Sequence, residues 1–380
     1  MKSNRDTIVI AGGGTGGHVF PGLAIADAVT AVADVRVIFV GTARGLESRV
    51  IPARGYELEL LDVEPMKGGG AKRAVRGAAV ASLATVRALS LIRKIRPRVI
   101  LSVGGYAAGP ICLAAAMARI PLALLESNAK MGLANRLLAP FARRVYLATE
   151  EGKSRATRAN AIRTYGMPIR SGFSPSPYRP NTTLRLLVLG GSQGALALNE
   201  RVPMAMARSK TPNVEVVHQA GRDRDVDVRK AYAREKFDRV TVVPFFDDVA
   251  SEISKADLII ARAGAGSTAE ITAIGRASIL VPFPFAADDH QAKNAEALAR
   301  RGGCIAIRQE SADDVRLALE IDRAFANDAA RVKMADAARA YGRPRAARDV
   351  AEDLAALAGI VTRVPEKTNG MSQAHLPEAS

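Results

Sequence analysis

Two stretches decide the fold of this 380-residue chain: Thr7-Ile-Val-Ile-Ala-Gly-Gly-Gly-Thr-Gly-Gly17 and Leu184-Arg-Leu-Leu-Val-Leu-Gly-Gly-Ser-Gln-Gly194. Each is a short apolar run that ends in a glycine-rich loop, and a helical pattern follows, which is typical of a strand–loop–helix unit. The similar start of the two halves is a weak internal duplication. We therefore expect an α/β fold with two Rossmann-like domains, whose parallel sheets face an interdomain cleft.

Further apolar runs of strand length alternate with helical patterns, which favours βαβ units and parallel sheets. Strands are expected at 7–11, 35–40, 99–103, 122–125, 145–147, 184–189, 214–219, 240–243, 258–261 and 278–281, and helices include 21–32 and 74–94. Pro and Ser are dense in 171–183, which predicts a linker. The expected domains are therefore 1–170 and 184–360, with a disordered tail at 361–380.

The composition describes a globular protein with an uneven charge. Hydrophobic residues make up 48% and charged residues 24%, while aromatics are 4% and Trp is absent, which argues against a stacking surface for single-stranded nucleic acid. Two cysteines form no disulfide framework, which favours a cytosolic protein. Residues 1–170 hold 25 basic and 11 acidic side chains, and the rest holds 29 and 27. An anionic partner is expected for the first half only.

Membrane insertion is not expected. The apolar stretch at the N-terminus is too short for the core of a signal peptide. The uncharged run 99–118 has the length of a bilayer span, but Gly104, Gly105, Gly109 and Pro110 interrupt it, so we interpret it as a strand, a loop and a helix.

The first two glycine loops have the composition of anion-binding loops, because glycine lets backbone N–H groups approach a ligand. Gly12, Gly14 and Gly17 match a dinucleotide fingerprint, but no acidic residue ends the next strand, so that reading is disfavoured. Thr15 and His18 place a hydroxyl and an imidazole at the first loop, although His18 could also be a helix-start residue without chemistry. Ser192 in the second loop is a candidate phosphate ligand or a helix cap.

The third loop, 261–270, opens a helix with small residues and two hydroxyls. Glu270 stands three residues after Ser267, which fits either a capping box or a carboxylate that binds ribose hydroxyls. Downstream, Asp288 and Asp289 could bind a metal. The D-x-D pattern at 225–227 is read as a solvated helix start instead, because charges of both signs surround it.

Taken together, the motifs resemble the MurG family of glycosyltransferases over nearly all of residues 7–360. The matching residues are Gly13 to His18 with Pro21, Gly104-Gly105-Tyr106, Glu126 and Asn128, Gly166, Pro168 and Arg170, Gly190 to Gly194, Ala263 to Glu270, and His290, Gln291 and Asn294. The resemblance implies the GT-B fold, no D-x-D metal site and no cofactor. It also implies inverting transfer of N-acetylglucosamine from UDP-N-acetylglucosamine to undecaprenyl-pyrophosphoryl-muramoyl-pentapeptide in peptidoglycan synthesis.

The resemblance also assigns residues to the donor and acceptor. The substrate-binding set it implies is Thr15, Gly16, Gly17, Asn128, Arg170, Ser192, Phe246, Ala265, Gly266, Ser267, Thr268, Ala269, Glu270, Gln291 and Asn294. Within it, Ser192 would hold the pyrophosphate, Glu270 the ribose, Phe246 the uracil through its backbone, and Gln291 and Asn294 the sugar hydroxyls. The family's His-Glu-x-Asn reads Leu125-Glu126-Ser127-Asn128 here, which leaves His18 and Glu126 as the catalytic candidates. His18 is the preferred base, because its ordinary pKa lies near neutrality.

A basic and apolar stripe on the expected helix 72–94 predicts contact with an anionic membrane surface, or alternatively a solvated face. Its residues are Lys72, Arg76, Val80, Leu83, Arg87 and Lys94. With the resemblance, it implies a peripheral protein on the cytoplasmic face of the bacterial inner membrane, with cell-wall synthesis proteins as further partners and no nucleic acid. Two rival functions are a sugar-nucleotide epimerase of the same fold and a non-catalytic binder of nucleotide sugars or nucleic acid.

Overall fold

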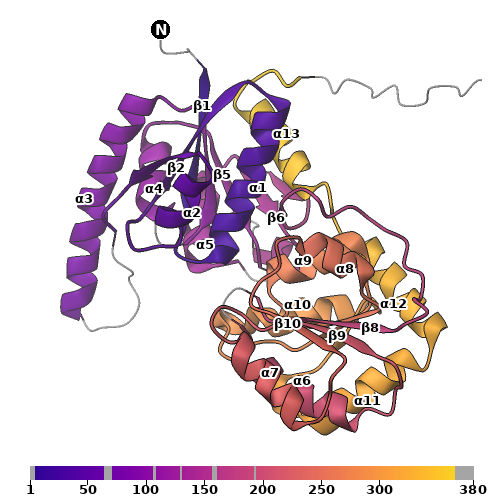
Figure 1. Cartoon of the computed structure of the whole chain (residues 1–380). Helices are drawn as coiled ribbons and strands as arrows, with labels where there is room; N and C mark the ends of the chain where they lie inside the picture. The colour runs from indigo at the N-terminus through magenta and orange to yellow at the C-terminus, as the bar shows by residue number, and fades with distance from the viewer. Residues whose placement is uncertain are drawn as a thin grey trace, which may run out of the picture.

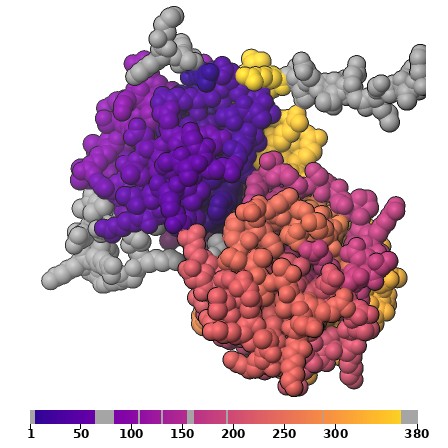
Figure 2. All heavy atoms as spheres, in the orientation of Figure 1, coloured from indigo at the N-terminus to yellow at the C-terminus, as the bar shows by residue number. Residues whose placement is uncertain are grey.

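Two lobes, each built on a parallel sheet, form the protein. The computed structural model describes residues 5–63, 71–105, 108–128, 131–155, 161–191 and 194–363. Helices cover both faces of each sheet, and the lobes lie against each other (Figure 1, Figure 2). The two Rossmann-like domains expected from the paired glycine loops are confirmed.

The first lobe carries strands β1 to β7. Their order in the sheet is β3 (Glu57–Leu60), β2 (Val35–Gly41), β1 (Asp6–Gly12), β4 (Val99–Gly104), β5 (Leu122–Glu126), β6 (Arg144–Leu147) and β7 (Ile162–Thr164). Its helices are α1 (Gly16–Val32), α2 (Glu47–Ala53), α3 (Ala71–Ile95), α4 (Ala108–Met117) and α5 (Leu133–Leu138), with the short 3-10 helices η1 (Ala139–Phe141) and η2 (Glu150–Arg155). The neighbouring strands of this sheet pair in parallel, so their carboxyl ends share one edge.

The second lobe repeats this plan. Its sheet order is β10 (Val240–Val243), β9 (Glu215–Gln219), β8 (Arg185–Leu189), β11 (Leu258–Ala261), β12 (Ser278–Leu280) and β13 (Ile305–Ala306), again parallel. Its helices are α6 (Leu196–Arg208), α7 (Asp225–Arg234), α8 (Val249–Lys255), α9 (Ala265–Ile274), α10 (His290–Ala299), α11 (Asp314–Phe325) and α12 (Asp328–Tyr341), with η3 (Ala287–Asp289) and η4 (Gln309–Ser311). One more helix, α13 (Ala346–Leu357), follows in the sequence.

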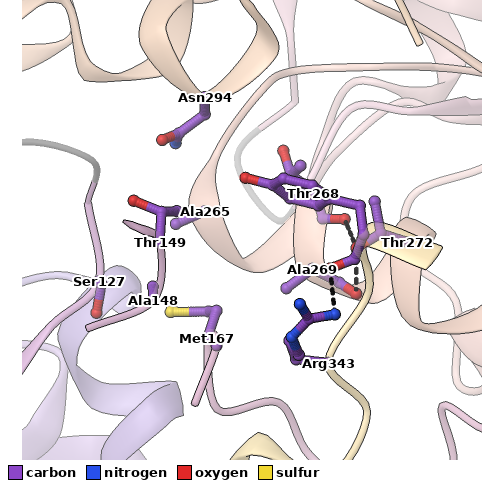
Figure 3. Close-up of a pocket in the computed structure, with 12 residues that line it drawn as sticks. Ser127, Ala148, Thr149, Met167, Ala265, Thr268, Ala269, Thr272, Asn294 and Arg343 are labelled. Carbon is purple, nitrogen blue, oxygen red and sulfur yellow. Dashed lines mark hydrogen bonds between the residues drawn. The ribbon is translucent and has the colours of Figure 1, made fainter. Parts of the chain in front are cut away.

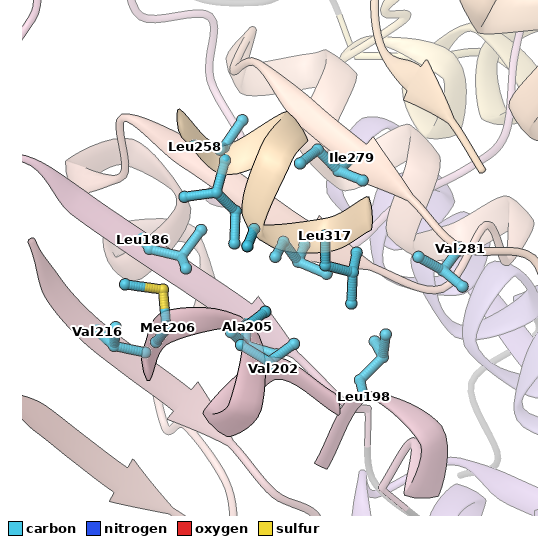
Figure 4. Close-up of a cluster of buried hydrophobic side chains, with 14 of the residues drawn as sticks. Leu186, Leu198, Val202, Ala205, Met206, Val216, Leu258, Ile279, Val281 and Leu317 are labelled. Atoms are coloured by element: carbon cyan, nitrogen blue, oxygen red, sulfur yellow. The ribbon is translucent and has the colours of Figure 1, made fainter. Parts of the chain in front are cut away.

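Each sheet is buried on both faces, which explains the continuous apolar runs in the sequence. Neighbouring side chains of a strand point to opposite faces. Ile8 and Ile10 therefore join the core under α1, while Val9 joins the core under α3 and α4. In the second lobe, Leu186 packs with residues of α6 and α11 (Figure 4), whereas Leu187 packs on the face that carries α8 and α9.

The elements agree closely with those expected from the sequence. Every expected strand lies within one residue of an observed one. The predicted start of the first helix was wrong. Helix α1 begins at Gly16 and not at Pro21, and Thr15 is the residue that precedes its first turn. Strands β3, β7 and β13 were not expected, and all three lie at sheet edges.

The last helix returns to the first lobe. Although α13 follows the second lobe in sequence, it packs along α1 (Figure 1), and its Val350 and Leu354 belong to the core that also holds β1. Asp353 accepts hydrogen bonds from Tyr146 Oη at 2.8 Å and from Arg144 Nε at 3.1 Å. The chain therefore crosses between the lobes twice: first in the segment 165–184, which follows β7 and contains the expected linker, and again just before α13.

Two further features concern the termini and the membrane. Residues 364–380, most of the expected tail, lie outside the described residues. Within the described ranges, no helix combines the length and apolar character that a membrane span requires.

Leu354→Ala tests the return of α13. Leu354 is fully buried, so its truncation should lower the free energy of unfolding by about 2–5 kcal/mol. Val361→Ala is the matched control, because Val361 is 89% exposed and its truncation should cost less than about 0.5 kcal/mol. Urea unfolding followed by circular dichroism measures both. Equal losses in the two variants would contradict the packing of α13 on the first lobe.

Candidate active site

A pocket lies between the lobes, at the carboxyl edges of both sheets. Ligands of open α/β sheets bind at this edge. The first lobe contributes residues that follow β5, β6 and β7, and the second contributes the stripe of α9 that faces them, with residues of α10 and of the second crossing (Figure 3). The lining residues are Ser127, Ala148, Thr149, Gly166, Met167, Ala265, Thr268, Ala269, Thr272, Asn294, Tyr341 and Arg343.

Unpartnered polar atoms gather around this pocket. In the first lobe, Ser127 Oγ and Thr149 Oγ1 are buried without a hydrogen-bond partner, and across the pocket the same holds for Thr268 Oγ1 and Asn294 Oδ1. The amide nitrogen of Asn294 donates to Ala263 O at 3.1 Å, which fixes the direction of its oxygen. Buried polar groups without partners are rare, so these atoms indicate a place for a polar ligand group or ordered water.

The first glycine loop is closed on one side by a carboxylate. Gly14 N–H donates to Glu47 Oε2 at 2.7 Å, and Gly13 N–H points to Gly104 O at 3.4 Å. The expectation that these N–H groups are free for an anion was therefore wrong for Gly14. Gly16 and Gly17 lie in the first turn of α1, where the helix dipole favours negative charge.

His18 is held by the same loop. Its Nδ1 lies 3.2 Å from Gly13 O and 3.4 Å from Thr15 Oγ1. A carbonyl oxygen can only accept, so this geometry puts the proton of the neutral ring on Nδ1 and leaves the Nε2 lone pair free. Burial lowers the pKa of His18, and the Gly13 carbonyl and the carboxylates of Glu126 and Glu47 partly oppose that shift.

Glu126 is enclosed by donors from the loop that follows it and from α5. Its Oε1 accepts from Asn128 N–H at 3.1 Å, and its Oε2 accepts from Gly132 N–H at 2.9 Å and Asn135 Nδ2 at 3.0 Å. Only 4% of the residue is exposed. The carboxylate of Glu126 therefore holds the loop that carries Ser127 and Asn128, and its charge also raises the pKa of His18.

Arg170 and Glu270 meet where the first crossing reaches α9. Arg170 Nε lies 3.4 Å from Glu270 Oε1, and its guanidinium stacks on Phe173 at 5.3 Å. Burial raises the pKa of Glu270, and Arg170 opposes that shift. The residue before the first turn of α9 is Gly264 and not Ser267, so the capping-box reading of Glu270 was wrong.

The remaining candidates are distributed around the same edge. Gln291 Oε1 accepts from Phe283 N–H at 3.0 Å, which orients its amide. The Phe246 side chain is buried in the core beside β11, while Ser192 lies outside the described residues. Ala265, Gly266, Ser267, Thr268 and Ala269 form the start of α9.

Three residues at this edge were missed by sequence reasoning. No sequence pattern marks Glu47 as a site residue, because a single acidic residue after a strand looks the same as an ordinary surface acid. Ser127 and Thr149 follow the ends of β5 and β6, so their positions beyond strand ends could have indicated them.

The metal readings find no support in the described ranges. No group of three His, Cys, Asp or Glu side chains there could hold a metal ion. Asp225 begins α7 and pairs with Arg229 at 2.8 Å, so the solvated helix start expected at the D-x-D pattern is confirmed.

A second surface of interest lies on the first lobe. Leu83 and Val86 on α3 are 56% and 62% exposed. Arg87 pairs with Asp62 at 2.7 Å, and Lys94 lies 3.9 Å from Glu59. The side chains of Lys72, Arg76 and Val80 lie outside the described residues. Helix α4 packs on α3 and α5 on α4, and together with η1 they add further exposed apolar residues: Leu113, Met117, Leu133, Leu137 and Phe141.

Comparison with known proteins gives a consistent result. The sequence matches the glycosyltransferase family 28 N-terminal domain over residues 8–147 and the C-terminal domain of the same family over 185–353. It is 52% identical over 359 residues to the UDP-N-acetylglucosamine--N-acetylmuramyl-(pentapeptide) pyrophosphoryl-undecaprenol N-acetylglucosamine transferase of Sorangium cellulosum, covering 93% of this chain and 88% of that protein. The protein of the same name from Acidithiobacillus ferrooxidans is 42% identical over 353 residues, covering 91% and 96%.

Solved structures agree with the sequence matches. The crystal structure of MurG from Acinetobacter baumannii superposes with a TM-score of 0.79 at 29% identity, covering 92% of this chain and 99% of that one. A UDP-N-acetylglucosamine 2-epimerase superposes with a TM-score of 0.65 at 15% identity, covering 93% and 96%, which shows a shared fold alone. The chain therefore belongs to glycosyltransferase family 28 and, within it, to the MurG family.

Proposed function

We propose that this chain transfers N-acetylglucosamine from UDP-N-acetylglucosamine to undecaprenyl-pyrophosphoryl-muramoyl-pentapeptide, with inversion at the anomeric carbon. Two bacterial relatives that match this chain over more than nine-tenths of its length bear the name of this transferase. The observation that carries the proposal is the contact between α1 and α9, which begin at the glycine loops of opposite lobes. In this proposal the base, His18 on α1, and the nucleotide site at the start of α9 come from opposite lobes.

The donor would bind mainly to the second lobe. Glu270 would accept the ribose hydroxyls once the donor separates it from Arg170, and Arg170 would turn to the pyrophosphate. The start of α9 would face the phosphates with its N–H groups and positive dipole. Gln291, Asn294 and Asn128 would bind the sugar, Ser192 the pyrophosphate, and the Phe246 backbone the uracil.

The acceptor would approach from the first lobe, residues 1–170, near Thr15, Gly16 and Gly17. Its sugar hydroxyl attacks the anomeric carbon of the donor and passes its proton to Nε2 of His18. The bond between that carbon and the UDP oxygen breaks, and its electron pair leaves with UDP. Arg170 and the N-terminus of α9 stabilise the charge that develops on UDP. Glu126 keeps the loop of Asn128 in place beside His18.

Transfer itself is directly measurable. Purified protein, radiolabelled UDP-N-acetylglucosamine and a short-chain analogue of the lipid-linked acceptor should give labelled disaccharide, with and without EDTA. An arm without acceptor should leave the donor unchanged. Conversion of the donor without acceptor would instead indicate the epimerase, and a folded protein inactive in both arms would contradict the proposed transfer.

His18→Gln should lower kcat by about 10²- to 10⁴-fold and change the donor KM little, because the base acts in the transition state. The base must be neutral to accept a proton. Because burial lowers the pKa of His18 below its ordinary 6.5, kcat of the wild type should rise with pH through a value below 6.5 and then stay level. The variant should lose this limb in a steady-state pH profile. An identical limb in His18→Gln would remove His18 from the mechanism.

We also propose that α3, α4, α5 and η1 form the membrane-facing surface. Each of these neighbouring elements carries exposed apolar side chains, from Leu83 on α3 to Phe141 on η1, and exposed apolar residues gathered in one region of a surface mark an interaction site. Arg136 on α5 and Arg143 next to η1 are exposed, and so are Arg87 and Lys94 on α3, which lie beside the carboxylates of Asp62 and Glu59. A basic residue contributes about 1 kcal/mol near an anionic surface. Such a surface would hold the enzyme at the cytoplasmic face of the membrane, where its lipid-linked acceptor is anchored.

The double variant Leu137→Glu/Phe141→Glu should lose most binding to vesicles that contain anionic phospholipid, since it replaces apolar contact by repulsion. Val315→Glu is the control, because Val315 is 59% exposed but lies on α11 of the second lobe. Vesicle co-sedimentation measures binding, and transfer to a water-soluble acceptor verifies that the site is intact. Equal binding by the double variant and the control would refute this surface.

A further inference from the structure

A buried carboxylate outside the proposed set of catalytic and substrate-binding residues holds the loop that carries the base. We propose that Glu47 is a positioning residue for His18, acting through the single peptide group that joins Gly13 to Gly14. The inference rests on the proposed transfer function, in which His18 accepts the proton of the acceptor hydroxyl.

Glu47 is fixed by three donors. Its Oε2 accepts from Gly14 N–H at 2.7 Å, and its Oε1 accepts from the N–H of Thr42 at 3.0 Å and from the Thr42 hydroxyl at 2.9 Å. The residue is 1% exposed. A buried carboxylate needs such partners, because the loss of hydration is otherwise too costly. Both oxygens therefore have defined directions.

Glycines from three segments make room for this carboxylate. A Cβ at Gly13 would lie 2.2 Å from the nearest Glu47 atom, a Cβ at Gly41 2.5 Å, and a Cβ at Gly45 2.1 Å. Real Cβ atoms do not approach so closely. The loop before α1, the end of β2 and the approach to α2 are thus all shaped around the Glu47 side chain.

The link to His18 runs through one rigid plane. Gly14 N–H, which Glu47 binds, and Gly13 C=O, which binds His18 Nδ1 at 3.2 Å, belong to the same peptide group. That group is planar, with its N–H and C=O pointing in opposite directions. Rotation of the peptide would break both hydrogen bonds at once. Glu47 therefore keeps the carbonyl turned toward His18, and the carbonyl keeps the proton on Nδ1 and the lone pair on Nε2.

The charges around His18 come from three further elements. Glu126 on β5 and Glu47 on α2 raise the pKa of His18, and His290 on α10 of the other lobe lowers it, while burial remains the largest effect. Loss of the Glu47 charge should therefore lower the pKa of His18 further, in addition to releasing the peptide.

Glu47→Gln tests the positioning role. Both Glu47 oxygens accept from backbone N–H groups, so in either orientation the Gln NH₂ meets one donor and cannot replace the carboxylate. We expect kcat to fall by about 10- to 100-fold with little change in donor KM, because the base is misplaced while the donor site of the second lobe is untouched. The acid limb of the kcat profile should move to lower pH.

Nitrogen NMR of the His18 ring gives a readout that does not depend on activity. In the wild type the neutral ring should carry its proton on Nδ1, and Glu47→Gln should populate the other tautomer, with His18→Gln used to assign the signals. Glu57→Gln is the control, because Glu57 is an exposed carboxylate of the same lobe that pairs with Arg36, and it should change neither kcat nor the tautomer.

Thr42→Val keeps the experiment decisive if Glu47→Gln fails to fold. Val has a volume similar to that of Thr but lacks the hydroxyl that donates to Glu47, and the backbone N–H of residue 42 remains in place. Thr42→Val should therefore shift the His18 tautomer and kcat in the same direction as Glu47→Gln, but by less. An unchanged tautomer in a folded variant would overturn the positioning role, as would a fall in kcat with an unmoved acid limb. Full turnover by His18→Gln would instead refute the proposed base, while a tautomer shift in Glu47→Gln would still support the positioning.

Discussion

The burial of α13 against α1 governs the arrangement of the two lobes. Because this last helix belongs to the first lobe, the chain must cross twice, and the two crossings touch: a Cβ on Gly166 would lie 2.4 Å from Cβ of Arg343. Gly166, Met167, Tyr341 and Arg343 also line the pocket between the lobes. The pocket is therefore built on the connections themselves, and any change in the angle between the lobes changes the pocket.

This arrangement divides the chemistry between two rigid halves. The proposed base His18 and the carboxylates of Glu47 and Glu126 belong to α1, α2 and β5 of the first lobe, whereas the candidate nucleotide ligands belong to α9, α10 and the first crossing. The unpartnered atoms of Thr149 and Asn294 come from different lobes and line the same pocket (Figure 3). Neither lobe alone presents a complete site, so the protein must hold both in register to bring a nucleotide sugar and an acceptor together.

The sequence predicted most of the fold because buried parallel strands leave strong apolar runs between glycine loops. It did not predict β3, β7 and β13, which are short edge strands with partly exposed side chains and thus have weak patterns. The position of α13 could not be predicted from the sequence either, because the pattern of an amphipathic helix shows which of its faces is buried but not which lobe it packs against. Among site residues, loops with glycine and hydroxyl groups were visible, but Glu47 was not, because its meaning lies in burial and in partners that only the fold brings together.

A crystal structure of the protein with UDP-N-acetylglucosamine tests the central claim most directly. The account predicts that the nucleotide sugar lies between the lobes, with the ribose on Glu270, the Arg170–Glu270 ion pair separated, and the face of the anomeric carbon opposite UDP open toward His18 Nε2. A donor bound away from this pocket, or bound with the ion pair intact and His18 remote from the anomeric carbon, would contradict it.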